Sequence, residues 1–213
     1  MVLERSGGDD GIMVDGSFHQ HGPQLQSGAY GEGFFVNSAD LITLADNTSF
    51  SISDSHGVAY AVLALDGVQW EVYSVDNNGT YGVKWDVSAV GRGLSRKGWT
   101  GAANTDPSLI NQLRTLDFNR SEEFQAFADR LAGPSASSSP FTGDKHFHLS
   151  DYHVHHDGSW FGSVRMFPTR IIYSSEYVND EVNAGCILCS ESSHNFNYIH
   201  DMRHYIQHRR NYI

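Results

Sequence analysis

The chain has 213 residues, of which 39% are hydrophobic and 12% aromatic, and its formal net charge is −11. This composition is typical of a folded protein with one large domain or two small ones, not of a disordered chain. The negative charge argues against general binding to nucleic acids or anionic membranes, because both need a basic face. No apolar run approaches the roughly 20 residues of a membrane span, and the charged, Gly-rich residues 1–11 contain no signal-peptide core.

A polar, glycine-rich segment follows at residues 15–31, with neither helical nor strand periodicity. It contains His19, His21 and Tyr30, three side chains that can move protons. Its glycines allow tight turns and a close approach of the backbone to a ligand. Because loops on a rigid scaffold often carry binding and catalytic residues, we expect a site to be built around this segment.

Two helices are predicted next. Apolar residues indicate a helix over 34–45 that packs on more than one side. A second helix can be capped by Ser53 or Asp54, and its apolar spacing continues as far as Val72. It is expected to end before the turn cluster at residues 76–79. A strand or extended arm is then predicted over residues 81–88.

Two further helices complete the helical part of the chain. Asp106-Pro107, a capping residue followed by proline at the first helical position, opens a helix that runs to about Leu116. Ser121 opens another, whose acidic first turn suits the helix dipole. Its predicted buried face consists of Phe124, Phe127, Ala128 and Leu131.

The sharpest change in composition lies at residues 133–140, a Gly/Pro/Ser-rich run typical of a linker. After it the apolar spacing changes from helical to alternating, which predicts strands. The predicted organisation is a helical part over residues 1–132, a linker over 133–144 and a β part over 145–213. The expected strands lie at residues 146–149, 152–155, 160–167, 170–177 and 186–190.

The first candidate constellation is the pair His21 and Tyr30. A tyrosine with an ordinary pKa of about 10 is a poor base at neutral pH unless nearby cations stabilise its phenolate. Arg92 and Arg96 lie four residues apart and would project from the same face of one helical turn. They are candidates for that role, and the alternative is a basic surface patch or two unrelated ion pairs.

A second hypothesis rests on histidines. Alternation places two of them on one face of a predicted strand and two on one face of the next. Such imidazoles could bind zinc or copper, or could simply pack in the sheet. The Cys186/Cys189 pair has no second ligand pair, so ordinary buried cysteines are expected. The histidines are His146, His148, His153, His155 and His156.

Three motifs resemble one known family. Asp-Gly-Ser-Phe-x-Gln-His at residues 15–21, followed by Tyr-Gly at 30–31, is similar to the catalytic loop of polysaccharide lyase family 8, which includes hyaluronate, chondroitin AC and xanthan lyases. Gly-Arg-x-x-Ser-Arg at residues 91–96 resembles the family's arginine segment. Residues 176–185 resemble its Asn-Gly-Glu-Asn-x-x-Gly turn, with Asp180 and Val182 as departures from the pattern.

The resemblance implies an α+β multidomain fold. The C-terminal part of an α/α toroid would be followed by the first strands of an antiparallel β-sandwich with galactose-mutarotase-like topology. The family also uses a catalytic Asn and an aromatic substrate patch upstream of the loop, and only fourteen residues precede the loop here. The chain is therefore interpreted as a truncated lyase, whose partial toroid would leave apolar helix faces exposed.

The implied reaction is β-elimination at a uronic acid of a glycosaminoglycan-like polysaccharide, with no metal or organic cofactor. It needs a base for the C5 proton, an acid for the leaving C4 oxygen and neutralisation of the carboxylate. The resemblance assigns these steps to Tyr30 and His21, with Arg92 and Arg96 tuning Tyr30 and Glu181 supporting the site. The substrate-binding residues it implies are His19, Gln20 and Asn179.

The expected partner is an acidic polysaccharide, and the resemblance implies secretion. One alternative is a catalytically inactive carbohydrate-binding remnant that lacks the upstream Asn. Another is a metal-binding β protein built on the histidines. The sequence leaves the oligomeric state and the identity of the polysaccharide open.

Overall fold

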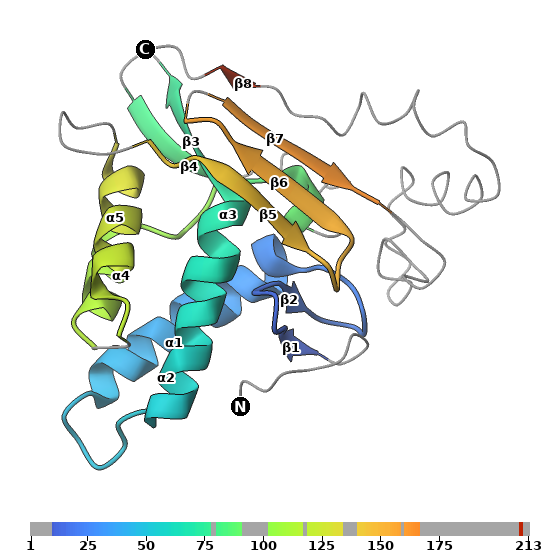
Figure 1. Ribbon diagram of the computed structural model, residues 1–213. Helices are drawn as coiled ribbons and strands as arrows, with labels where there is room; N and C mark the ends of the chain where they lie inside the picture. The colour runs from blue at the N-terminus through green and yellow to red at the C-terminus, as the bar shows by residue number, and fades with distance from the viewer. Residues whose placement is uncertain are drawn as a thin grey trace.

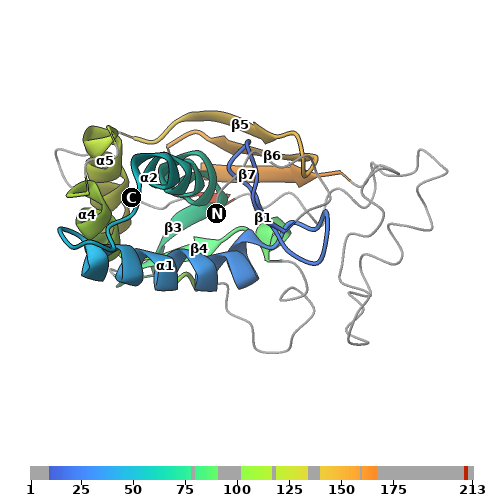
Figure 2. The same cartoon turned by 90° about the horizontal axis from the view of Figure 1, so that it is seen from below.

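The structure is a computed structural model, and it describes residues 10–77, 80–90, 102–116, 119–133, 140–158, 160–166 and 209–210. Its elements lie in layers (Figures 1 and 2). An antiparallel sheet, β5 to β8, forms one side, and helix α1 lies on the other. The helix that begins with α2 and the hairpin of β3 and β4 lie between them, while α4 and α5 stand at one end.

The first predicted helix is confirmed at its C-terminus and begins two residues earlier than expected, and the second is confirmed at its N-terminus. Helix α1 covers Glu32–Ala45, and the second helix starts after Ser53, whose backbone is extended. That second helix is continuous through a π-helical stretch. It consists of α2 (Asp54–Ala61), η2 (Val62–Val68) and α3 (Gln69–Glu71).

The predicted C-terminus of the second helix is wrong. The backbone changes to extended at Val72, where strand β3 (Val72–Asn77) begins. This strand pairs in antiparallel register with β4 (Thr80–Trp85), from Val72 opposite Trp85 to Asn77 opposite Thr80. The β-branched and aromatic residues of β3 suit a strand, and the Asn-Gly sequence between the strands is typical of a tight hairpin. The predicted strand over 81–88 is thus confirmed in its first half, and a 3₁₀ turn, η3 (Val87–Ala89), follows.

The third and fourth helices begin at the predicted residues, and the first of them has the predicted side-chain cap. In α4 (Pro107–Arg114), the Asp106 carboxylate accepts hydrogen bonds from the backbone N–H groups of Ser108 and Leu109 at 2.7 and 2.9 Å. In α5 (Ser121–Ala132), the four residues of the predicted buried face are all buried. Local sequence patterns alone therefore identify these two helices correctly.

Three of the five predicted strands lie in one sheet, with the order β5-β6-β7-β8. The first strand begins and ends earlier than expected, so His148 lies in the following turn and not beside His146 on a strand. The predicted strands over 170–177 and 186–190, and both cysteines, lie outside the described residues. The strands are β5 (Gly143–Phe147), β6 (Tyr152–His156), β7 (Trp160–Arg165) and β8 (Arg209–Arg210).

The core joins the helices, the β3–β4 hairpin and the inner face of the sheet. The Tyr152 hydroxyl of β6 donates a 2.6 Å hydrogen bond to the buried Asp86 carboxylate after β4. Burial raises the pKa of both groups. Large core side chains with almost no exposed surface include Phe35, Tyr60, Leu65, Trp85, Ile110, Phe127, Phe147 and Tyr152.

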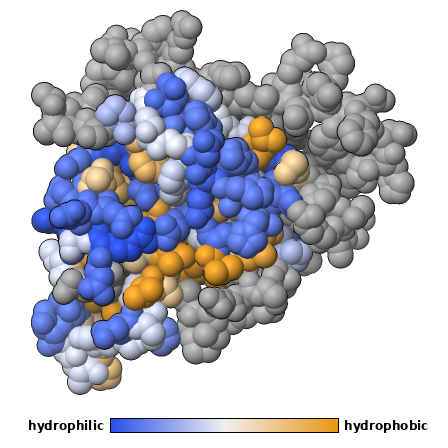
Figure 3. Space-filling model, in the orientation of Figure 1, coloured by the Kyte–Doolittle hydropathy of each residue, from blue (hydrophilic) through white to orange (hydrophobic). Residues whose placement is uncertain are grey.

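Apolar side chains are exposed on the helical layer. Phe34, Leu41, Ile42, Ile52 and Tyr60, with Ser38 and His56, line an apolar hollow of about 370 Å³ between α1 and α2. Figure 3 shows an apolar strip on a largely hydrophilic face of the molecule. None of the helices in the described part of the chain has the length and apolar character to cross a bilayer.

Candidate active site

The loop over residues 15–31 begins in a small hairpin. Strand β1 (Gly11–Ile12) pairs with β2 (Phe18–His19), and the chain turns tightly between them at Gly16, which has a φ of +92°. The Asp15 carboxylate closes this turn, because its Oδ1 accepts hydrogen bonds from the Ser17 hydroxyl (2.6 Å) and backbone N–H (3.1 Å). The Asp-Gly-Ser sequence therefore shapes the loop.

One side of the loop lies directly on the second helix. A Cβ on Gly67 would be 2.1 Å from the Gly16 carbonyl oxygen, and a Cβ on Gly16 would be 2.5 Å from the Asp66 backbone. Two glycines thus permit backbone-to-backbone contact between loop and helix. The neighbouring Asp66 is held by Arg120 in a two-pronged ion pair at 2.7 and 3.1 Å.

We expect Gly67→Ala to destabilise the fold by about 2–3 kcal/mol, because the added methyl group meets backbone that cannot rotate away. Gly33→Ala is the matched control, since a Cβ at this helical position meets nothing within 4 Å. That control should be neutral or stabilising by about 0.5–1 kcal/mol. Urea unfolding measures both changes, and a Gly67→Ala variant as stable as wild type would show that the contact is not tight.

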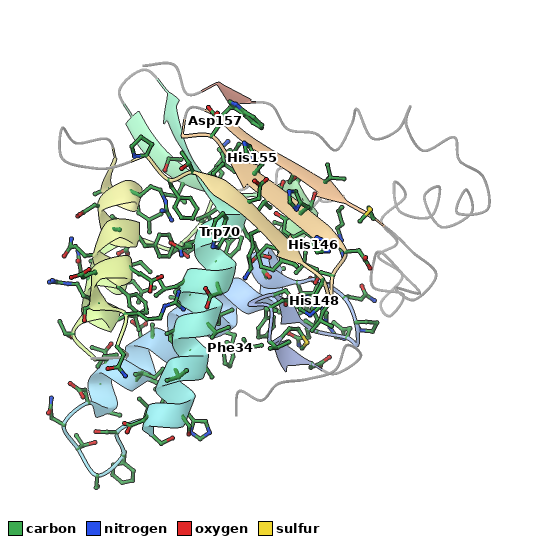
Figure 4. All side chains as sticks on the ribbon, in the orientation of Figure 1. Phe34, Trp70, His146, His148, His155 and Asp157 are labelled. Carbon is green, nitrogen blue, oxygen red and sulfur yellow. The ribbon has the colours of Figure 1, made fainter. Side chains whose placement is uncertain are left out.

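The other side of the loop is bonded to the turn between β5 and β6. Asp15 Oδ2 accepts a hydrogen bond from the Leu149 backbone N–H at 2.9 Å. His19 Nε2 lies 2.8 Å from Ser150 Oγ and 3.4 Å from Ser17 Oγ. His148, labelled in Figure 4, is exposed on the same turn with Nδ1 3.8 Å from Asp15 Oδ2. The loop is thereby fixed between the helical layer and the sheet.

His19 is an interior residue of this junction. It has no exposed surface, and its Nδ1 has no hydrogen-bond partner among the described residues. Burial lowers the pKa of His19 to about 4, with Asp15 opposing this shift and Arg165 adding to it. The imidazole is therefore neutral at physiological pH. Its contacts support a structural role, whereas the neighbouring Gln20, also expected to bind substrate, is half-buried.

The structure brings His21 and Tyr30 together. Their ring centroids lie 5.2 Å apart at 66°, an edge-to-face arrangement. His21 is exposed and has a φ of +62°, a strained conformation that often marks a functional residue. Tyr30 is partly buried against the core in the π-helical turn η1 (Ser27–Gly31), and such turns also occur frequently at functional sites.

Glycines allow the Tyr30 turn to pack closely between two aromatic side chains. A Cβ on Gly28 would be 2.9 Å from the Trp85 ring and 2.7 Å from Val90 Cγ1. A Cβ on Gly31 would be 3.0 Å from the Phe18 ring. The turn therefore packs against β2 on one side and against the end of the β3–β4 hairpin on the other.

The remaining predicted site residues lie outside the described part of the chain. These are Arg92, Arg96, Asn179 and Glu181. The described residues that flank the arginine segment do lie at the Tyr30 turn. Val90 contacts Gly28, and Asn104 is hydrogen-bonded to Glu32, two residues after Tyr30.

A buried acid that no sequence pattern predicts lies beneath this site. Glu71, the last residue of α3, has no exposed surface, and burial raises the pKa of its carboxyl group to about 8, with the Ser27 hydroxyl opposing the shift. Ser27 is the first residue of the Tyr30 turn. A lone Glu before a strand has no distinguishing sequence pattern, so only the tertiary structure identifies it.

The histidines of the sheet do not converge on one point. His146, His153 and His155 belong to its exposed side, His148 lies in the turn, and His156 is buried. Asp144 Oδ1 lies 2.8 Å from His155 Nδ1 and 3.2 Å from His153 Nε2. Within the described residues, no group of three or more His, Cys, Asp or Glu side chains has the geometry of a metal site. The histidine-based metal hypothesis therefore has no support in this part of the chain.

Comparison with known families shows which family the loop and the helices around it belong to. The sequence model described as "Polysaccharide lyase family 8, N terminal alpha-helical domain" matches residues 1–130. The chain belongs to polysaccharide lyase family 8. The resemblance seen in its motifs is thereby confirmed, and the helical N-terminal domain with small antiparallel sheets fits an α+β lyase.

Solved lyases of this family share the fold. A chondroitinase AC lyase, solved in enzyme–oligosaccharide complexes, has a TM-score of 0.65 and 22% identity, over 82% of this chain and 24% of that one. A Paenibacillus xanthan lyase has a TM-score of 0.55 and 22% identity, over 84% of this chain and 19% of that one. The Streptomyces coelicolor A3 chondroitin AC lyase in complex with chondroitin sulphate has a TM-score of 0.55 and 18% identity, over 80% of this chain and 27% of that one.

The chain thus spans about a quarter of the length of the chondroitinase AC lyase. A search among curated proteins found no match.

Proposed function

We propose that this chain carries the Tyr–His part of the active site of a lyase that cleaves a uronic-acid-containing, glycosaminoglycan-like polysaccharide by β-elimination. The observation that carries the proposal is the His21–Tyr30 contact on a loop fixed from two sides. A phenol and an imidazole at this separation can serve one sugar ring, because both can accept and donate protons.

In the proposed reaction, the Tyr30 phenolate takes the proton from C5 of the uronate. The electron pair of that C–H bond forms the C4–C5 double bond, and the C4–O bond to the neighbouring sugar breaks. The leaving oxygen then takes a proton from the Tyr30 hydroxyl, which restores the phenolate. His21 binds the carboxylate or assists proton transfer, so that negative charge does not accumulate at C5.

Arg92 and Arg96 are proposed to supply the positive charge that stabilises the phenolate. Two contacts support this assignment. Val90, before the arginine segment, lies against Gly28 of the Tyr30 turn, and Asn104, after the segment, is hydrogen-bonded to Glu32, the residue that follows the turn. Glu181 and Asn179 are proposed, by family resemblance alone, to support the site and bind substrate. Gln20, on the loop itself, is the other proposed substrate contact.

The finer fold assignment belongs to the same proposal. The helices would be the last part of an α/α toroid, and the sheet the start of a galactose-mutarotase-like β-sandwich. The whole protein would act outside the cell on an acidic polysaccharide. The apolar hollow between α1 and α2 is consistent with further helices packing there in a longer chain.

The test is the ultraviolet absorbance of the unsaturated uronate that β-elimination creates. The purified chain is incubated separately with chondroitin sulphate, hyaluronan and xanthan. Rising absorbance with one of them would support the proposal and identify the substrate. Folded protein that binds a polysaccharide without any rise in absorbance would instead favour an inactive carbohydrate-binding remnant.

A further inference from the structure

We propose that Glu32 is the positioning residue of Tyr30. It would hold the Tyr30 turn to the β3–β4 hairpin and to the chain that follows the arginine segment. This inference rests on the proposed function, because it concerns the residue proposed to transfer the proton. None of the three motifs that identify the family includes Glu32.

Glu32 is the first residue of α1, and its carboxylate accepts three hydrogen bonds from elements distant in sequence. Oε1 accepts from the indole Nε1–H of Trp85 at 2.8 Å and from the backbone N–H of Asn104 at 2.5 Å. Oε2 accepts from Asn104 Nδ2 at 3.1 Å. One side chain therefore joins α1, β4 and the segment after residue 101.

These bonds bear directly on Tyr30, which lies two residues earlier. The Trp85 indole that Glu32 holds is also the ring against which Gly28 packs, and Gly28 belongs to the same π-helical turn as Tyr30. Glu32 thus holds the C-terminal end of the turn. It also holds the Trp85 ring, which packs against Gly28 within the turn. Loss of the carboxylate would release both restraints on the turn that carries Tyr30.

The role is geometric and not electrostatic. A negative charge beside a phenolate opposes ionisation, so the charge of Glu32 brings no benefit to a tyrosine base. Glutamine should therefore replace it well. Its amide oxygen can accept from Trp85 and from the Asn104 backbone, and the Asn104 side-chain amide can rotate to accept from the new N–H₂ group.

The experiment compares Glu32→Ala, Glu32→Gln and Asp106→Ala. Asp106 is the matched control, because its carboxylate also accepts three hydrogen bonds, from Ser108 and Leu109 at the start of α4. We expect Glu32→Ala to lower kcat by about 10- to 100-fold with KM changed by less than about twofold, since small misplacements of a catalytic group have effects of this size. Glu32→Gln should restore most of the rate, and Asp106→Ala should keep it.

A second readout does not depend on turnover. Nuclear Overhauser effects between the His21 and Tyr30 rings should be present in wild type, Glu32→Gln and Asp106→Ala, and lost in Glu32→Ala. Retention of these effects and of kcat in Glu32→Ala would overturn the inference, as would equal losses in Asp106→Ala. Wild-type protein without turnover would count against the proposed function alone, because the ring contacts still report on Glu32.

Discussion

Tyr30→Phe is expected to lower kcat of the proposed β-elimination by about 10²- to 10⁴-fold, the range typical of a lost general acid–base group. The substitution removes one oxygen atom and keeps the ring, which packs on the core and meets His21 edge-to-face at 5.2 Å. Fold and substrate binding should therefore persist. Initial rates from product absorbance, measured beside affinity for the uncleaved polysaccharide, separate the two effects.

Tyr73→Phe is the matched control for this prediction. Tyr73 lies on β3, outside the loop over residues 15–31, and stacks on Phe161 at a centroid distance of 5.0 Å. It should keep the wild-type rate. If Tyr30→Phe retained full activity, Tyr30 would not be the proton-transfer group, and His21 would become the better candidate for the base.

The sequence predicts those features that depend on neighbouring residues. Asp106-Pro107 marks the start of α4 because the cap and the proline act within one turn, and the structure shows the Asp106 hydrogen bonds. The helix that begins at Ser53 shows where this reasoning fails. The apolar spacing of Leu65 and Val72 fits a helix, but pairing of Val72 with Trp85 converts the chain to a strand. Such long-range pairing is invisible to local periodicity.

In the candidate site, too, the features set by neighbouring residues can be predicted and those set by distant residues cannot. The motif identifies His21 and Tyr30 because they lie on one short loop, and the structure places their rings in contact. The residues that hold this loop by hydrogen bonds come from distant parts of the chain. Ser150 is 131 residues from His19, and Asn104 is 72 residues from Glu32. Neither pairing has a sequence pattern, so the buried character of His19 and the role of Glu32 could be inferred only from the fold.

The buried histidines are expected to lower the stability of the fold in acid, whereas the buried carboxyl groups of Glu71 and Asp86, whose pKa values are raised, oppose that loss. Burial lowers the pKa of both His19 and His156 to about 4, whereas an unfolded histidine titrates near 6.5. Between these values each histidine binds more protons in the unfolded chain than in the folded one, so its contribution to stability falls as pH drops below about 6.5 and levels off below about 4. Near pH 4.5 each histidine should cost roughly 2–3 kcal/mol, which together is a large part of a typical domain's stability.

Urea unfolding near pH 7.5 and near pH 4.5 measures this loss. His19→Gln and His156→Gln each remove one buried titrating group, so each should raise the stability near pH 4.5, relative to that near pH 7.5, by roughly 2–3 kcal/mol compared with wild type. His146→Gln is the matched control, because it removes a histidine from the exposed side of the sheet and leaves the interior intact.

Since His19 bonds Ser150 across the junction of loop and sheet, its protonation should also release the loop. Loss of the His21–Tyr30 ring contacts in acid should therefore accompany the loss of stability, and an unchanged pH difference in His19→Gln would refute this coupling.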